Sequence, residues 1–76
     1  MTKGQFDAAY RAFCGRHPFR TFLIEFLSGS QISVGHQEAA REEADIYVMR
    51  LPDGGYVLFS AESVVRLLDM PTATSN

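Results

Sequence analysis

A tight turn near the carboxyl end constrains the fold of this chain more than any other feature of its sequence. Pro52-Asp53-Gly54-Gly55 combines a proline, which presets one turn dihedral, with glycines, which accept positive φ. Short apolar segments flank the turn, at about 45–51 and 55–60. The sequence therefore predicts two strands joined as an antiparallel hairpin, and a sheet as the main element of the fold.

A second hairpin is expected earlier in the chain, around the turn signal Ser28-Gly29-Ser30. Before this turn, bulky apolar side chains recur at every second position from Phe22 to Phe26, as on the buried face of a strand. The same period continues after the turn. We therefore expect strands at about 20–28 and 31–35.

The amino-terminal segment has the pattern of an amphipathic helix. Thr2 and Gln5 have the spacing of a capping box, in which side chains and backbone bond reciprocally at a helix start. Aromatic residues follow at i, i+4 and i+7 from Phe6, which places them on one helical face. Pro18 prevents the helix from continuing. The sequence predicts a helix over residues 3–14.

Two segments fit more than one structure. Residues 38–44 are rich in helix formers, so they form either a helical turn or a charged loop between the second and third strands. Residues 61–70 form either a helix or a short turn, Ala61-Glu62-Ser63, followed by a last strand at 64–69. An apolar segment this short cannot be assigned from its pattern alone.

Size and composition indicate one small globular domain. The chain has 76 residues, enough for a single core, which we expect over 1–71 with a disordered tail at 72–76. One cysteine excludes a disulfide framework, and no apolar run reaches the roughly 18 residues that span a bilayer. No signal-peptide pattern is seen, so we expect a cytoplasmic protein without a membrane partner.

The order of the expected elements resembles that of Sm-like β-barrels: a helix, a bent hairpin, an irregular connection, a tight hairpin and a last short strand. Residues 22–32 resemble the first Sm motif, where a strand meets its partner through a glycine turn, and residues 61–65 resemble the short turn into the closing strand. This resemblance implies a mainly β fold, in which an N-terminal helix precedes a strongly bent five-stranded antiparallel Sm-like barrel.

The chain also resembles a group of small uncharacterised bacterial proteins. These proteins share a Pro-Phe-x-x-Phe start, a glycine turn and a His-Pro-Glu segment. The matching positions here are Pro18–Phe22, Gly29 and His36-Gln37-Glu38, where Gln37 departs from the usual proline.

The resemblance to Sm-like barrels also implies assembly, because such barrels form rings by joining the fourth strand of one subunit to the fifth strand of the next. Edge strands that carry neither charge nor proline invite such pairing, and the fourth expected strand carries neither. We therefore expect a homo-oligomer, with a monomer as the alternative. The expected edge residues are Tyr56, Val57, Leu58, Phe59, Val64 and Val65.

Charge bears on whether RNA is a second partner. Sm-like RNA binders of the Hfq type contact bases from the loop between strands two and three and from the turn before the last strand. Both places carry carboxylates in this chain, and carboxylates repel phosphates. The acidic loops therefore disfavour RNA as a partner. Residues 1–20, by contrast, carry four cations and one carboxylate, so if RNA binds anywhere, the helix and the residues after it are the better candidate surface. The candidate residues are Arg11, Arg16, His17 and Arg20.

Catalysis and metal binding are not expected. His36 and Glu38 supply two ligands at most, and a metal site needs three or four. Cys14 lies at the negative end of the helix dipole, which raises a thiol pKa and disfavours a nucleophile. We therefore expect a non-enzymatic binding or scaffolding module with no cofactor and no small-molecule substrate. The alternative is a small αβ partner-binding domain of the antitoxin type, with a C-terminal helix and no nucleic-acid role.

Overall fold

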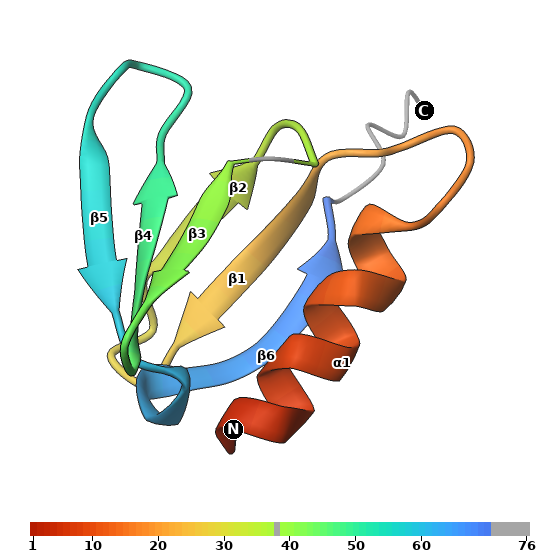
Figure 1. Ribbon diagram of the computed structural model, residues 1–76. Coiled ribbons are helices and arrows are strands. Elements are labelled where there is room, and N and C mark those ends of the chain that lie inside the picture. The colour runs from red at the N-terminus through yellow and green to blue at the C-terminus, as the bar shows by residue number, and fades with distance from the viewer. Residues whose placement is uncertain (38, 71–76) are drawn as a thin grey trace.

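A helix and two three-stranded antiparallel sheets make up the described part of the protein (Figure 1). The structure is a computed structural model that describes residues 1–37 and 39–70. In chain order the elements are α1 (Lys3–Cys14), β1 (Phe22–Phe26), β2 (Gln31–Val34), β3 (Ala40–Glu43), β4 (Ile46–Arg50), β5 (Tyr56–Phe59), the 3-10 helix η1 (Ala61–Ser63) and β6 (Val64–Asp69). In one sheet β1 lies between β2 and β6, and in the other β4 lies between β3 and β5.

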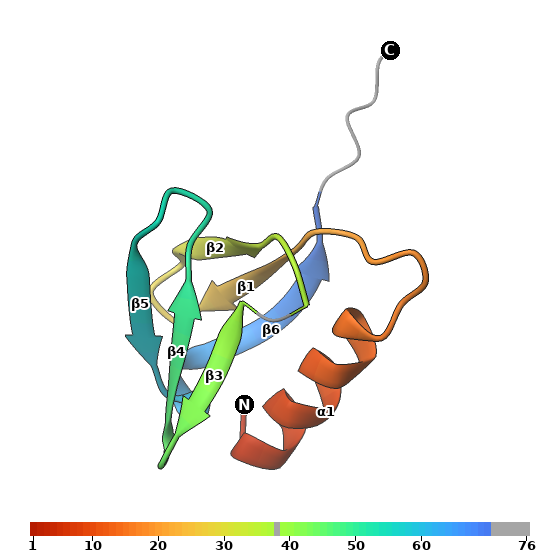
Figure 2. The same ribbon diagram turned by 45° about the horizontal axis from the view of Figure 1, so that its top comes forward.

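The core lies between the two sheets and is covered on one side by α1, which lies beside β3 and β6 (Figures 1 and 2). Phe6 of α1 is 1% exposed, and its ring centroid lies 4.7 Å from that of Tyr47 and 5.7 Å from that of Phe59. These contacts join the helix to β4 and β5. The remaining fully buried large side chains come from strands of both sheets: Phe22, Ile24, Val34, Met49 and Val64.

The predicted helix over 3–14 is confirmed, and so is its capping box. The Gln5 N–H donates to Thr2 Oγ1 at 3.1 Å, and the Thr2 N–H donates to Gln5 Oε1 at 2.9 Å. At the other end, the Gly15 N–H donates to the Arg11 carbonyl oxygen at 2.9 Å. At both ends of the helix, local hydrogen bonds therefore satisfy backbone groups that have no partner within the helix.

The structure corrects the predicted number of strands from five to six. Residues 40–43, predicted as a helical turn or a charged loop, form β3, in which Ala40 pairs with Met49 and Glu43 pairs with Ile46. Pairing with β4 satisfies backbone groups of both strands, which outweighs the modest helix preference of the β3 residues. The turn that joins the two strands contains no glycine. Its residue with positive φ is Ala44, at 56°.

The predicted closed barrel is also corrected. Among the described residues, no strand of one sheet is hydrogen-bonded to a strand of the other, so the fold is a mixed α/β arrangement of a helix and two sheets. β2 ends at Val34 and β3 begins at Ala40, and the connection between them carries the chain from one sheet to the other.

Of the two structures expected for residues 61–70, the short turn followed by a strand is confirmed. Residues 61–63 form one 3-10 turn, and β6 pairs antiparallel with β1, so the alternative C-terminal helix is wrong. Both predicted hairpins are confirmed, although β1 is shorter than the expected 20–28. The expected tail at 72–76 lies outside the described residues.

Replacing Ala44 by glycine is expected to stabilise the protein. At φ 56° the Cβ of Ala44 crowds the backbone, at a cost of about 1–2 kcal/mol. Glycine removes that strain from the folded state, but its greater freedom stabilises the unfolded chain by about 0.4–1 kcal/mol. Urea unfolding should therefore show that the free energy of unfolding rises by about 0.5–1 kcal/mol. The control Ala8→Gly, at an exposed helix position, should lose about 1 kcal/mol. A less stable Ala44→Gly variant would contradict the described turn.

Candidate functional site

The outer edge of β5 is open and apolar. The Leu51 N–H donates to the Gly55 carbonyl oxygen at 2.8 Å, and bonded and non-bonded pairs alternate along β4 and β5 from that point. The N–H and C=O groups of Tyr56 and Leu58 therefore point away from β4. Both side chains are 65% exposed, and the strand carries no charge. This edge can accept a further strand.

A groove of about 460 Å³ lies beside this edge. One wall is β5, and the other is the turn from β1 to β2. A 2.9 Å bond from the Phe26 N–H to the Ser30 carbonyl oxygen holds the turn, and Gly29 adopts φ 92°, which glycine takes without strain. Leu27 in this turn is 73% exposed, the highest exposure among the large apolar side chains described. The apolar residues of the groove are Phe26, Leu27, Ile32, Val57, Leu58 and Phe59.

The six predicted edge residues contribute in different ways. Phe59 and Val64 are 7% and 0% exposed, so their side chains belong to the core and only their backbone is available to an edge. Val57 is half-buried and lines the groove. Val65 on β6 is 44% exposed, and the neighbouring Val64 carbonyl oxygen accepts a 2.6 Å bond from the Met1 nitrogen. Val65 is therefore the exposed apolar side chain of β6, as Tyr56 and Leu58 are of β5.

Arg16, one of the four predicted RNA-binding residues, is engaged within the protein. Its Nη1 lies 2.5 Å from Asp69 Oδ1, its Nε donates to the Phe13 carbonyl oxygen at 3.3 Å, and its Nη2 donates to the Arg20 carbonyl oxygen at 3.2 Å. The guanidinium also lies 4.7 Å from the centroid of the Phe13 ring. Arg16 therefore ties the end of α1 to the end of β6. The other three predicted residues, Arg11, His17 and Arg20, are exposed.

The connection between β2 and β3 is attached to the carboxyl end of α1. Gln37 Nε2 donates to the Cys14 carbonyl oxygen at 2.7 Å, and Cys14 Sγ lies 3.9 Å from the Gln37 carbonyl oxygen. Burial raises the pKa of the Cys14 thiol, so little thiolate exists at neutral pH. Glu38 lies outside the described residues, and within those residues no group of three or more His, Cys, Asp or Glu side chains is placed to hold a metal ion.

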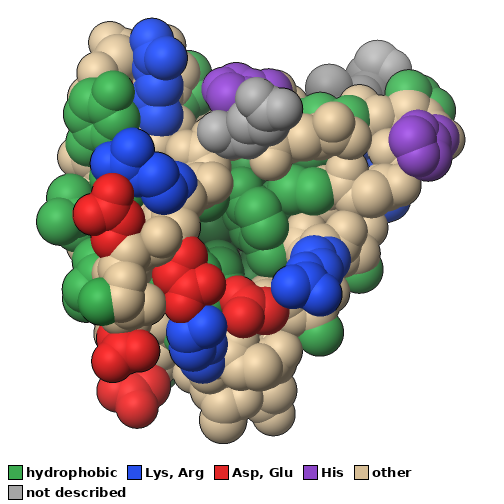
Figure 3. All heavy atoms as spheres, in the orientation of Figure 1, with side chains coloured by type: hydrophobic (Ala, Val, Ile, Leu, Met, Phe, Trp, Pro, Cys, Tyr) green, Lys and Arg blue, Asp and Glu red, His purple; other side chains and the backbone are tan. Residues whose placement is uncertain are grey.

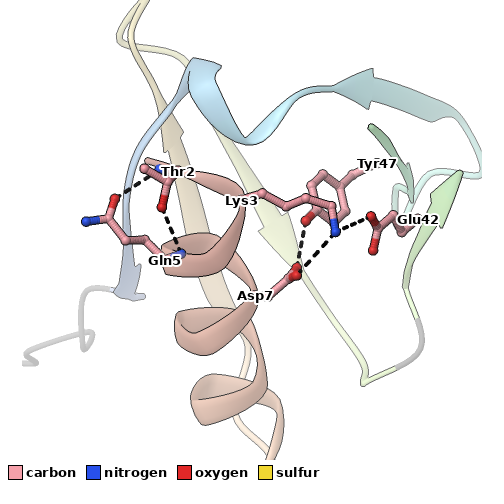
Figure 4. Close-up of polar contacts among 6 residues, drawn as sticks. All are labelled: Thr2, Lys3, Gln5, Asp7, Glu42 and Tyr47. Carbon is pink, nitrogen blue, oxygen red and sulfur yellow. Dashed lines mark hydrogen bonds and ion pairs between the residues drawn. The ribbon is translucent and has the colours of Figure 1, made fainter. Parts of the chain in front are cut away.

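A polar cluster, the Lys3–Asp7–Glu42–Tyr47 clasp, joins the start of α1 to the second sheet (Figure 4). The Tyr47 hydroxyl donates to Asp7 Oδ1 at 2.6 Å. Lys3 Nζ lies 2.5 Å from Glu42 Oε2 and 3.6 Å from Asp7 Oδ2. Burial, together with the bond to Asp7, raises the pKa of Tyr47. The clasp therefore holds a neutral phenol against a carboxylate.

A small apolar hollow remains between α1 and β3, beside the clasp (Figure 3). Its volume is about 170 Å³, and Phe6, Tyr10, Ala40 and Tyr47 are among its lining residues. Pockets that hold cofactors or drug-sized ligands usually measure about 300–1,000 Å³. The hollow therefore suits a packing defect or a very small molecule better than a substrate.

Comparison of the chain with protein-family models, with curated proteins and with solved structures finds no match. In the part of the chain that the structure describes, no helix has the length and hydropathy needed to cross a membrane.

Removing the Tyr47 hydroxyl is expected to weaken the clasp in a pH-dependent way. Tyr47→Phe leaves Asp7 without its donor and should cost about 1.5 kcal/mol at pH 7. The folded-state pKa of Tyr47 is raised above its ordinary value of 10.0, so its contribution is complete below pH 10 and is lost as pH rises further. Unfolding between pH 9 and pH 11 should therefore show a steeper loss of stability in the wild type than in Tyr47→Phe.

The matched control for this experiment is Tyr56→Phe, which removes a hydroxyl from a side chain that is 65% exposed. This change should alter stability by less than about 0.5 kcal/mol. Equal effects of the two substitutions would show that the bond to Asp7 does not hold the helix.

Proposed function

We propose that this protein is a non-enzymatic, homo-oligomeric binding or scaffolding module of the Sm-like kind, in which β5 of one copy pairs with β6 of the next. The observation that carries the proposal is the uncharged outer edge of β5, which pairs with no other strand among residues 1–37 and 39–70. Two of its four residues hold large apolar side chains that are 65% exposed. Such an edge is an aggregation hazard in a monomer, and a closed assembly removes it.

The groove beside β5 supports the same proposal. A strand added to this edge from another copy would lie next to the apolar wall formed by Leu27 and Ile32. Val65 of β6 is an exposed apolar residue on a strand that is also at the edge of its sheet. Pairing these two edges would bury apolar surface from both copies, which stabilises a core that is thin in so short a chain.

The chain topology supports the Sm-like part of the proposal. β2 is at the edge of one sheet and β3 is at the edge of the other, and they are consecutive. The Arg50 N–H donates to the Ala39 carbonyl oxygen at 2.8 Å, which extends the β3 pairing back to residue 39. This supports reading the two consecutive strands β2 and β3 as the counterpart of the single bent second strand of an Sm-like barrel, which passes from one sheet to the other.

RNA association has weaker support. Arg16 is bonded to Asp69 and to two carbonyl oxygens, so its guanidinium is not available to a phosphate without breaking those bonds. The end of β3 and the turn after it present exposed carboxylates at Glu43 and Asp45, which repel phosphates. Assembly through strand edges needs neither group.

Two substitutions test the proposed pairing. Leu58→Pro removes an outward N–H of β5 and leaves the bonds to β4 in place, and Val65→Glu puts a carboxylate on β6. Light scattering after size-exclusion chromatography should give a multiple of 8.5 kDa for the wild type at micromolar concentrations. Both variants should shift toward 8.5 kDa, because each blocks one of the two paired edges.

The control is Met70→Glu, since Met70 is as exposed as Val65, at 44%, and lies beyond β6. This variant should keep the wild-type mass. Circular dichroism of each variant separates loss of assembly from loss of fold. A wild-type mass of 8.5 kDa, or an assembled Leu58→Pro variant, would contradict the proposal.

A further inference from the structure

The outer face of the β3-β4-β5 sheet combines arginines with apolar side chains. The strand register places Arg41, Val48 and Leu58 in one row across the three strands, and Arg50 and Tyr56 in the next such row. Side chains two residues apart on a strand share a face, so both rows project to the same side of the sheet. Figure 3 shows Lys or Arg side chains beside hydrophobic ones over this part of the molecule.

These five side chains line a hollow of about 430 Å³ together with Ala39. The cationic residues come from β3 and β4, and the exposed apolar residues Tyr56 and Leu58 come from β5. The hollow therefore has one charged side and one apolar side. We call it the Arg41–Arg50 face.

The two guanidiniums of this face are available to a ligand. Within residues 1–37 and 39–70, Arg50 makes no hydrogen bond or ion pair through its side chain. Arg41 Nε lies 3.0 Å from Glu43 Oε2, but the two side chains are 70% and 59% exposed, and such exposed pairs contribute little. Arg50 also borders a second hollow of about 430 Å³, formed with His36 and Pro52.

We propose that the Arg41–Arg50 face docks an acidic amphipathic segment of another protein. The carboxylates of that segment pair with Arg41 and Arg50, and its apolar side chains cover Tyr56, Leu58 and Val48. Guanidiniums recognise carboxylates through paired, charge-assisted hydrogen bonds, and an exposed Tyr beside Arg is typical of interface centres. The charge complementarity of the hollow carries this assignment.

Two other occupants fit the face less well. Two phosphate contacts from single-stranded RNA would give a slope of only about −1.4 when the logarithm of affinity is plotted against the logarithm of salt concentration. The hollow also offers only one ring for base stacking, that of Tyr56. A second copy that meets this face with its own identical face would set arginine against arginine.

The inference does not rest on the proposed oligomer. A strand that pairs with the edge of β5 lies in the plane of the sheet and borders Leu58, which also lines the groove. Arg41, Val48 and Arg50 lie on β3 and β4, away from that edge. Assembly would therefore leave both guanidiniums accessible on every copy. Failure of one proposal leaves the other to be decided by its own measurement.

The test is selection from a random peptide display library with the intact protein as bait, followed by NMR of the ¹⁵N-labelled protein with a synthetic peptide of the selected sequence. Selected peptides should combine Asp or Glu with large apolar residues. The backbone signals that shift should be those of β3, β4 and β5 around Arg41, Arg50 and Tyr56. Replacing the acidic residues of the peptide by Asn and Gln should weaken binding.

The matched variants are Arg50→Gln and Arg20→Gln, which remove the same charge from two exposed arginines on different parts of the molecule. Arg50→Gln should lower the affinity for the peptide about fivefold, the upper range for one exposed ion pair, and Arg20→Gln should change it less than about twofold. Failure to select acidic peptides would overturn the proposal, as would signals that shift only on α1 or β6. Stronger binding of single-stranded RNA than of the peptide, or equal losses in the two variants, would also overturn it.

Discussion

The fold depends on the aromatic packing of Phe6 against Tyr47 and Phe59. Backbone bonding holds each sheet together but links no strand of one sheet to a strand of the other within the described residues. The sheets are joined by side chains: Phe59 of one sheet also packs against Phe26 of the other, with ring centroids 5.2 Å apart. Burying one such ring contributes about 2–3 kcal/mol, a large share of the stability of so small a domain.

The elements that could be predicted from the sequence are those that short-range chemistry specifies. The helix begins at a capping box, and two hairpins turn at glycines with φ of 92° and 95°. β3 could not be predicted from the sequence, for two reasons. Its residues Ala-Arg-Glu-Glu favour a helix, and only the unpaired side of β4 makes them a strand. Its turn uses Ala44 where glycine is the usual signal, so no local pattern marked it.

The candidate site could be predicted in outline. The lack of charge on β5 can be read from four consecutive residues, whereas its position at the edge of the sheet is set by the strand order. Which side chains of β5 face the core and which face outward is known only from the register of β5 with β4. The engagement of Arg16 by Asp69 joins residues 53 positions apart, and the bond from Tyr47 to Asp7 spans 40 positions. Contacts at such separations are created by the tertiary arrangement, and no local spacing reveals them.

Besides packing on the core, the helix connects the two sheets through polar side chains. Its first half is bonded to β3 and β4 through Lys3 and Asp7, and Arg16, two residues beyond its end, is bonded to β6. α1 thus connects two sheets that share no strand pairing in the part of the chain that the structure describes. Detaching it would uncover both sheets at once, so we expect the two sheets to unfold together in a single cooperative transition.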